Sequence, residues 1–300
     1  MRGMKVIAFI NFKGGVGKTS NAVNLAACLA KFHHKKVLLV DLDAQCNATG
    51  YLLRREERER QAAAPQRSVF QIYRDFLIGS HGFDFDASVL RGYPRSPEGN
   101  PYLPTLDVLP ATVELLDVED QIGGRTTTPY FTWLDQALRP HAKEYDYVFL
   151  DCPPHLHAIS KSALYFADYY VIPYIPDFLS LSGFRVFAKV VKRFQDQISG
   201  HRPKHARPRI AGAIVNRFKN VGSVFAEGVN LLTLEMRDLK AEGLVHEKAR
   251  IFDPPIRDCV GVAQCTNHHL PVILYNEACI GSLDYTALAE DFVNHLESLS

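Results

Sequence analysis

Short apolar runs recur along the chain, and each is followed by a glycine-rich, acidic or otherwise polar segment. Runs of this length that are rich in valine, isoleucine and leucine are typical of buried strands. The segments that fit this description are residues 5–10, 36–40, 106–109, 147–151, 169–174 and 210–215. Longer segments lie between them, and we predict helices over residues 20–32, 68–78, 131–142, 179–198 and 283–299. Strands that alternate with helices predict an α/β fold, with a single doubly wound, mostly parallel sheet and helices on both faces.

Two segments interrupt this alternation. Residues 54–67 (RREERERQAAAPQR) are strongly charged, which is typical of a solvated helical segment or a mobile loop. Residues 91–105 contain four prolines and two glycines, which predicts an exposed connection. The chain has 300 residues, enough for one large α/β domain and few for two, so we expect a single domain over residues 1–300.

A phosphate-binding loop is the first candidate for chemistry. Residues 11–19 read NFKGGVGKT and lie between the first predicted strand and the first predicted helix. Gly14, Gly15 and Gly17 let backbone N–H groups turn inward, which makes an anion-binding nest at a helix N-terminus. Lys18 would then reach the β- and γ-phosphates of a nucleotide, and the Thr19 hydroxyl would hold Mg²⁺. The alternative is a chance glycine-rich turn with solvated lysines, and the flanking strand and helix argue against it.

The loop departs from the usual pattern G-x-x-x-x-G-K-[ST] at its first glycine, where Phe12 stands, and Lys13 directly precedes the glycines. The segment K-G-G-V-G-K-T resembles the deviant Walker A motif of the ParA/MinD family of P-loop ATPases. The resemblance implies that ATP and Mg²⁺ bind here, and that Lys13 reaches across a homodimer interface to the nucleotide of the partner subunit. It implies that the nucleotide contacts Lys13, Gly14, Gly15, Val16, Gly17, Lys18, Thr19 and Ser20, with Lys13 and Lys18 as catalytic cations.

Acidic residues end two of the predicted strands. Asp41 and Asp43 follow the strand over residues 36–40, and two carboxylates at this edge could manage Mg²⁺ and water, although they could also cap a helix. The segment D-x-D-x-Q-x-N resembles the switch of the ParA family, with Ala44 where that family commonly has proline. The resemblance implies that Asp43 positions the attacking water and that Asp41 contacts the water shell of the metal. Asp151 ends the strand over residues 147–151 and matches a Walker B carboxylate near Mg²⁺.

Two further residues are implied in nucleotide binding by the same resemblance. Asn216 ends the strand over residues 210–215, where an asparagine of the family often reads adenine, although asparagine at a strand end is commonly only turn chemistry. Pro254 lies in a segment that resembles the family's base-contacting loop. The similarity extends from residue 4 to about residue 298, and no DNA-binding helix-turn-helix is expected before the first strand.

The net charge of +1 predicts no nucleic-acid or membrane partner for the chain as a whole, so any basic surface must be local. No apolar run approaches the length of a membrane span, we expect no signal peptide before the first strand, and the closing helix lacks a lysine-rich face. The six cysteines form no C-x-x-C pair and are expected to be free thiols. Candidate DNA contacts, each of which could equally be a solvated surface residue, are Lys189, Lys192, Arg193, Arg217, Lys219, Lys248, Arg250 and Arg257.

The resemblance implies a cytoplasmic, nucleoid-associated ATPase that dimerises with ATP and binds double-stranded DNA without sequence preference. A ParB-like activator protein would stimulate hydrolysis, and the cycle would partition plasmids or chromosomes or position other cargo. The alternatives are a metabolic or regulatory enzyme of the same superfamily and a nucleotide-gated adaptor that does not act on DNA. The sequence does not identify the cargo.

Overall fold

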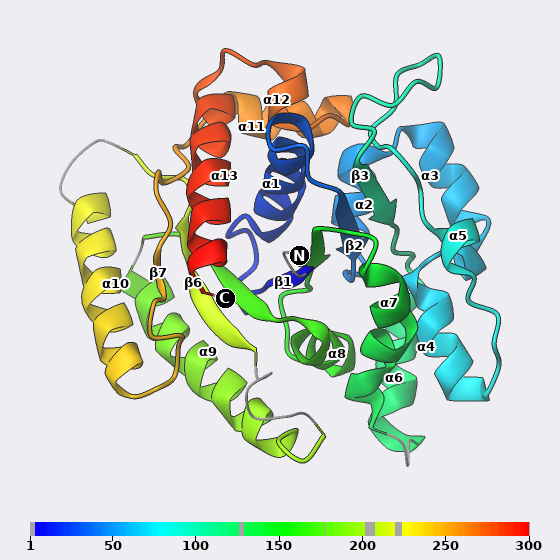
Figure 1. Ribbon diagram of the computed structural model, residues 1–300, viewed down its shortest axis with the longest axis horizontal. Coiled ribbons are helices and arrows are strands. Elements are labelled where there is room, and N and C mark those ends of the chain that lie inside the picture. The colour runs from blue at the N-terminus through cyan, green and yellow to red at the C-terminus, as the bar shows by residue number, and fades with distance from the viewer. Residues whose placement is uncertain (1–3, 126–128, 177, 202–207, 220–223, 300) are drawn as a thin grey trace.

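The computed structural model describes residues 4–125, 129–176, 178–201, 208–219 and 224–299. Its sheet has seven strands, all parallel, in the order β3-β2-β4-β1-β5-β6-β7 (Figure 1). The sheet extends from β1 in both directions, as the predicted doubly wound fold requires. The strands are β1 (Lys5–Phe9), β2 (Val37–Asp41), β3 (Leu106–Leu109), β4 (Tyr147–Asp151), β5 (Tyr169–Tyr174), β6 (Arg209–Val215) and β7 (Arg250–Ile251).

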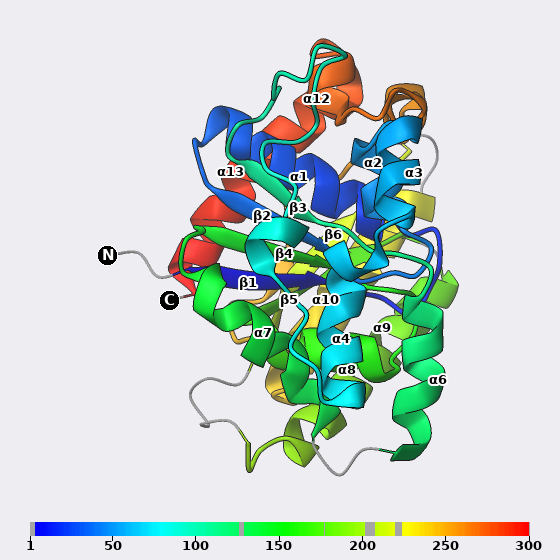
Figure 2. The same ribbon diagram turned by 90° about the vertical axis from the view of Figure 1, so that its right-hand side faces the viewer.

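Helices cover both faces of the sheet, which is seen from its edge in Figure 2. One face is covered by α1 (Lys18–Phe32), α2 (Asn47–Leu52), α11 (Val260–Gln264), α12 (Val272–Tyr275) and α13 (Ile280–Ser298). The other is covered by α4 (Val69–Ile78), α6 (Leu115–Arg125), α7 (Trp133–Ala142), α8 (Ala158–Phe166), α9 (Phe178–Gln197) and α10 (Val224–Ala241). Along β1, Val6 and Ala8 pack into one of these layers and Ile7 and Phe9 into the other, because successive side chains of a strand point to opposite faces.

The predicted fold class is confirmed, and each predicted strand and helix is present. Strands β3, β4 and β5 have the predicted ends, and each of the other predicted elements shifts at one or both ends by one to three residues. Helix α1 begins at Lys18 rather than at residue 20, because Gly17 adopts a left-handed conformation (φ 94°) and ends the loop there. The closing helix begins at Ile280 rather than at residue 283. The helices α6, α8 and α10 were not predicted, and neither were α5 (Phe85–Ser88) and the short strand β7.

The two interrupting segments follow expectation only in part. The charged segment forms helix α3 (Arg55–Ala62) and the 3₁₀ turn η1 (Pro65–Arg67), so the helical alternative holds. Residues 91–105 connect α5 to β3 as predicted, but the connection is not exposed throughout. Tyr93 and Leu103 are buried in the core on the α1 side of the sheet, because proline fixes the backbone without preventing a neighbouring side chain from packing inward.

Candidate nucleotide-binding site

The glycine-rich loop between β1 and α1 has the geometry of an anion cradle. Gly15 (φ 72°) and Gly17 (φ 94°) are left-handed, and a Cβ placed on Gly14 or Gly15 would meet no atom within 4 Å. The Lys18 ammonium donates to the carbonyl oxygen of Lys13 at 3.1 Å. Burial lowers the pKa of Lys18, and the negative charge of Asp151 is the largest opposing influence. The loop therefore presents open backbone and one sequestered cation at the N-terminus of α1.

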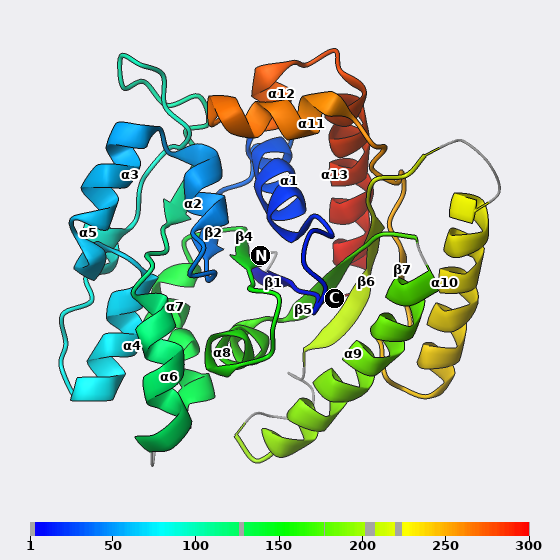
Figure 3. The ribbon, with the colours of Figure 1, turned by 180° about the vertical axis from the view of Figure 1, so that it is seen from behind.

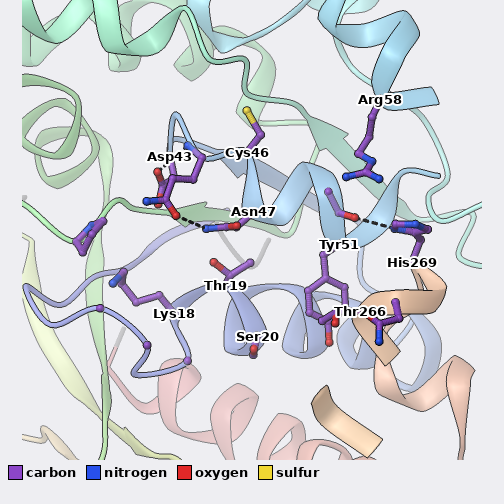
Figure 4. A pocket seen from close by; sticks show the side chains of 17 residues that line it. Lys18, Thr19, Ser20, Asp43, Cys46, Asn47, Tyr51, Arg58, Thr266 and His269 are labelled. Carbon is purple, nitrogen blue, oxygen red and sulfur yellow. Dashed lines mark hydrogen bonds between the residues drawn. The ribbon is translucent and has the colours of Figure 1, made fainter. Parts of the chain in front are cut away.

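A cavity of about 840 Å³ opens in front of this loop (Figure 4). It contains seven of the predicted site residues, namely Gly14, Gly15, Gly17, Lys18, Thr19, Ser20 and Asp43. These residues belong to the segments that follow β1 and β2, at the edge of the sheet where the parallel strands end. Ligands of doubly wound folds bind at this edge. The remaining predicted nucleotide and metal residues do not line it.

The surroundings of the Asp41 and Asp43 carboxylates differ and give the two residues different roles. Asp41 is fully buried, and one of its oxygens accepts hydrogen bonds from the Thr49 N–H (2.8 Å) and hydroxyl (2.7 Å). Its other oxygen accepts from the Asp43 N–H at 3.2 Å, and burial raises the pKa of Asp41 to about 6. Asp43 lines the cavity, with one oxygen accepting from the Gln45 N–H at 2.9 Å. The geometry thus makes Asp41 an anchor for the loop and α2, and places Asp43 where a ligand can reach it.

Asp151 lies beside Asp41 at the ends of adjacent strands, since the two are partners in the β2–β4 register. Both of its carboxylate oxygens are buried, and no described residue donates a hydrogen bond of normal geometry to either. Its pKa is raised well above the usual range, first by burial and then by the charge of Asp41, with Thr19 and Lys18 opposing. Mg²⁺ prefers oxygen ligands. The buried Asp151 carboxylate and the nearby Thr19 hydroxyl are oxygen groups that suit it.

Lys13, Asn216 and Pro254 lie outside the cavity. Lys13 is exposed, and its N–H donates to the Asn11 side chain at 3.0 Å. Asn216 is buried behind the loop, where its amide nitrogen donates to the carbonyl oxygens of Val16 (3.0 Å) and Ile214 (3.2 Å). The Asn216 amide therefore supports the phosphate loop from below, and its predicted contact with adenine stays a prediction.

The far wall of the cavity consists of residues that were not predicted from the sequence. Tyr51, Arg58, Thr266, Asn267 and His269 line it, opposite the phosphate loop, as Figure 4 shows for the labelled members. His269 adopts a left-handed conformation (φ 55°), and its Nδ1 lies 2.8 Å from the carbonyl oxygen of Gly50. Gln45, Cys46, Asn47, Gly50 and Pro154 complete the lining.

The chain is similar to known proteins in sequence and in fold. The profile of a family described as AAA domain matches residues 4–202. The chain is 30% identical to the sporulation initiation inhibitor protein Soj of Bacillus subtilis over 96% of this chain and 97% of Soj. It is 29% identical to the chromosome partitioning protein ParA of Caulobacter vibrioides, over 97% of this chain and 94% of that protein.

Among solved structures, apo McdA of Cyanothece is similar in fold, with a TM-score of 0.70 and 18% identity over 98% of this chain and 99% of McdA. The resemblance seen in the glycine-rich loop is therefore confirmed over nearly the whole chain. The chain belongs to the Soj/ParA family of P-loop ATPases.

Proposed function

We propose that this ATPase acts as a nucleotide-gated partition protein. It dimerises when ATP is bound, binds DNA without sequence preference in that state, and is released when a ParB-like partner stimulates hydrolysis. The observation that carries this proposal is the position of Lys13, which is exposed at the phosphate loop but does not line the cavity of its own chain. If a second subunit faces this loop, its nucleotide site would receive the Lys13 ammonium.

The chemistry follows from the groups that face the cavity. Lys18 and the backbone N–H groups of the loop bind the phosphates, and Asp43 orients a water molecule for in-line attack on the γ-phosphorus. Thr19 and Asp151 would hold Mg²⁺, which neutralises charge on the phosphate oxygens. A single chain supplies one buried lysine to the developing charge, so we propose that basal turnover is slow until a second cation arrives.

The predicted DNA-contacting residues divide into two groups. Lys189, Lys192 and Arg193 lie together on α9 and line a shallow hollow of about 620 Å³. Asp196 pairs with Lys192 at 2.6 Å, and no described residue pairs with Lys189 or Arg193. The members of the second group are bound within the chain: Lys219 to Asp258, Lys248 to the Ser298 carbonyl oxygen, Arg250 to Asp291, and Arg257 to Asp284.

Arg217 belongs to neither group. It is exposed, it follows Asn216 directly, and its backbone is left-handed (φ 53°). Cations that already hold a carboxylate gain little by moving to a phosphate, and in the α9 group Lys192 holds one, whereas no described residue pairs with Lys189 or Arg193. We propose that the α9 group, through Lys189 and Arg193 above all, carries DNA affinity. Nonspecific binding requires only such a cluster, so it is compatible with a net charge of +1.

The α9 group yields a direct test of DNA binding. With ATP and the hydrolysis-deficient Asp43→Ala background, affinity for a random duplex should fall about a thousandfold between about 50 and 200 mM salt if a dimer engages both α9 groups. Replacing Lys189, Lys192 and Arg193 by alanine should lower affinity at least about tenfold and flatten the salt dependence. Fluorescence anisotropy measures both effects.

A matched control replaces Lys219 and Lys248, which hold partners within the chain, and should leave affinity nearly unchanged. Absence of DNA binding by the ATP-bound protein would favour the alternative, a nucleotide-gated regulator that does not act on DNA. Equal losses in both variants would instead place the DNA surface elsewhere.

The names of the relatives suggest the cellular setting. Soj and ParA relatives are described as chromosome partitioning proteins, so we propose a chromosome or plasmid as cargo and a cytoplasmic, nucleoid-associated location. Within the part of the chain that the structure describes, no helix has both the length and the apolar character needed to cross a membrane.

A further inference from the structure

Two helices of the chain begin with the same short motif. Cys259-Val260-Gly261 leads into α11, and Cys279-Ile280-Gly281 leads into α13. In each case the cysteine is the residue before the first helical turn, and the glycine is the second helical residue. The two helices contact each other, and Figure 3 shows α11 above α1 and α13 beside it.

The glycines let the two cysteine side chains approach each other. A Cβ placed on Gly261 would lie 3.1 Å from the Cys279 sulfur and 3.5 Å from the Cys259 sulfur. A Cβ placed on Gly281 would lie 3.7 Å from the Cys259 sulfur. Both sulfur atoms therefore border the same small space, which stays open because residue 261 has no side chain.

Accessibility distinguishes this pair from most of the other thiols. All six cysteines are free, and Cys28, Cys152 and Cys265 are buried. Cys259 and Cys279 are partly exposed, so a small oxidant can reach them. Cys46, the remaining partly exposed thiol, lies in the nucleotide cavity.

We propose that Cys259 and Cys279 form a reversible intramolecular disulfide, a redox modification site of this protein. The oxidant is a low-molecular-weight disulfide or a hydroperoxide. The two thiols lose two protons and two electrons as the S–S bond forms, and the oxidant is reduced to two thiols or to an alcohol and water. Both sulfurs border the position of a Cβ on Gly261, so side-chain rotation can bring them to disulfide geometry with little backbone movement.

The pair is connected to the nucleotide cavity through a short path. Helix α11 runs directly into the 3₁₀ helix η4 (Cys265–His268), where Thr266 and Asn267 line the cavity. The buried Cys265 sulfur lies 2.9 Å from the hydroxyl of Tyr51, another cavity residue. A disulfide would fix α11, and with it this wall, to α13, which packs on α1. We expect oxidation to hold the wall in place and to slow nucleotide release.

Formation of the bond is tested on the full-length protein in a series of oxidised and reduced glutathione ratios. Peptide mapping should show one disulfide, between residues 259 and 279, and reduction should remove it. Closing this loop should raise Tm by about 5 °C. Mixed disulfides with glutathione at separate cysteines, or a bond to any other cysteine, would overturn the assignment.

Two kinds of variant keep the test independent of folding. Cys259→Ser and Cys279→Ser should each abolish the bond and the rise in Tm. Gly261→Ala should also hinder the bond while both thiols remain, because its methyl group would fill the space that both sulfurs border. Gly200→Ala, whose added Cβ meets no atom within 4 Å, is the matched control and should oxidise like the wild type. Oxidation of Gly261→Ala at the wild-type rate would refute the geometric argument.

The effect on the cavity rests on the proposed nucleotide site and has its own readout. Release of a fluorescent ADP analogue should slow about threefold or more on oxidation, and this change should be absent in Cys279→Ser. Unchanged release would overturn the link between the disulfide and the cavity. A protein that forms the disulfide but binds no nucleotide when reduced would refute the proposed site and leave the redox pair intact.

Discussion

Replacing Asp43 with alanine is expected to lower kcat for ATP hydrolysis about a thousandfold, while ATP still binds. Asp43 is the acidic residue whose side chain lines the cavity next to the phosphate loop, and no described residue of the lining could replace it as a carboxylate. Asp41 cannot take over, because both of its oxygens accept hydrogen bonds from Thr49 and from the Asp43 N–H. The loss therefore falls on the chemical step and not on nucleotide affinity.

Single-turnover hydrolysis and the binding of a fluorescent ATP analogue separate these two quantities. Asp120→Ala, on the exposed side of α6, is the matched control and should behave as the wild type. Retention of more than about a tenth of wild-type turnover by Asp43→Ala would remove this residue from the mechanism. Loss of nucleotide binding would assign it a structural role instead.

Asp151→Asn is expected to unfold at a higher temperature than the wild type when no nucleotide or metal is present. No described residue donates a hydrogen bond of normal geometry to the buried Asp151 carboxylate, which also lies beside the charge of Asp41, so its ionised form destabilises the folded state. Removing the charge should stabilise the free protein by about 2 kcal/mol, or about 4 °C in Tm. The same variant should lose the stabilisation that Mg²⁺ and ATP give the wild type, because an amide is a poor ligand for Mg²⁺.

The pH dependence of this difference has a definite sign. The pKa of Asp151 is raised in the folded state, so folding is favoured where the group is protonated. That contribution is complete below the unfolded-state pKa and is lost as pH rises through the folded-state pKa. The advantage of Asp151→Asn should therefore be small near pH 4 and should grow as the pH rises. Calorimetry at several pH values measures it, with Asp120→Asn as control, and a variant less stable than the wild type at pH 8 would contradict the account.

The sequence predicted the parts of the site that depend on local pattern. Asp41 and Asp151 end buried strands, the phosphate loop and Asp43 come shortly after buried strands, and parallel strands bring their carboxyl ends to one edge. The different surroundings of Asp41 and Asp43 could not be predicted, because they depend on Thr49, eight residues from Asp41. Helix α10 was missed because no motif adjoins it.

The far wall of the cavity could not be predicted for a different reason. His269 reaches Gly50 across 219 residues of sequence, and neither position belongs to a motif. The basic residues show the same limit. The sequence does not distinguish Arg250 from Lys189 as a candidate DNA contact. Only the fold shows that Arg250 pairs with Asp291, whereas Lys189 has no ion-pair partner among the described residues. Pairing between distant segments is set by tertiary packing, which local periodicity does not encode.

Complementation between two inactive variants tests most directly whether Lys13 acts on the nucleotide of its partner. Lys13→Ala and Asp43→Ala should each be inactive alone. Mixed in equal amounts with ATP, they should recover about a quarter of wild-type hydrolysis, because half of the dimers are mixed and each has one complete centre. If mixed dimers form and remain inactive, or if Lys13→Ala alone hydrolyses ATP at the wild-type rate, catalysis does not depend on a lysine from the second subunit.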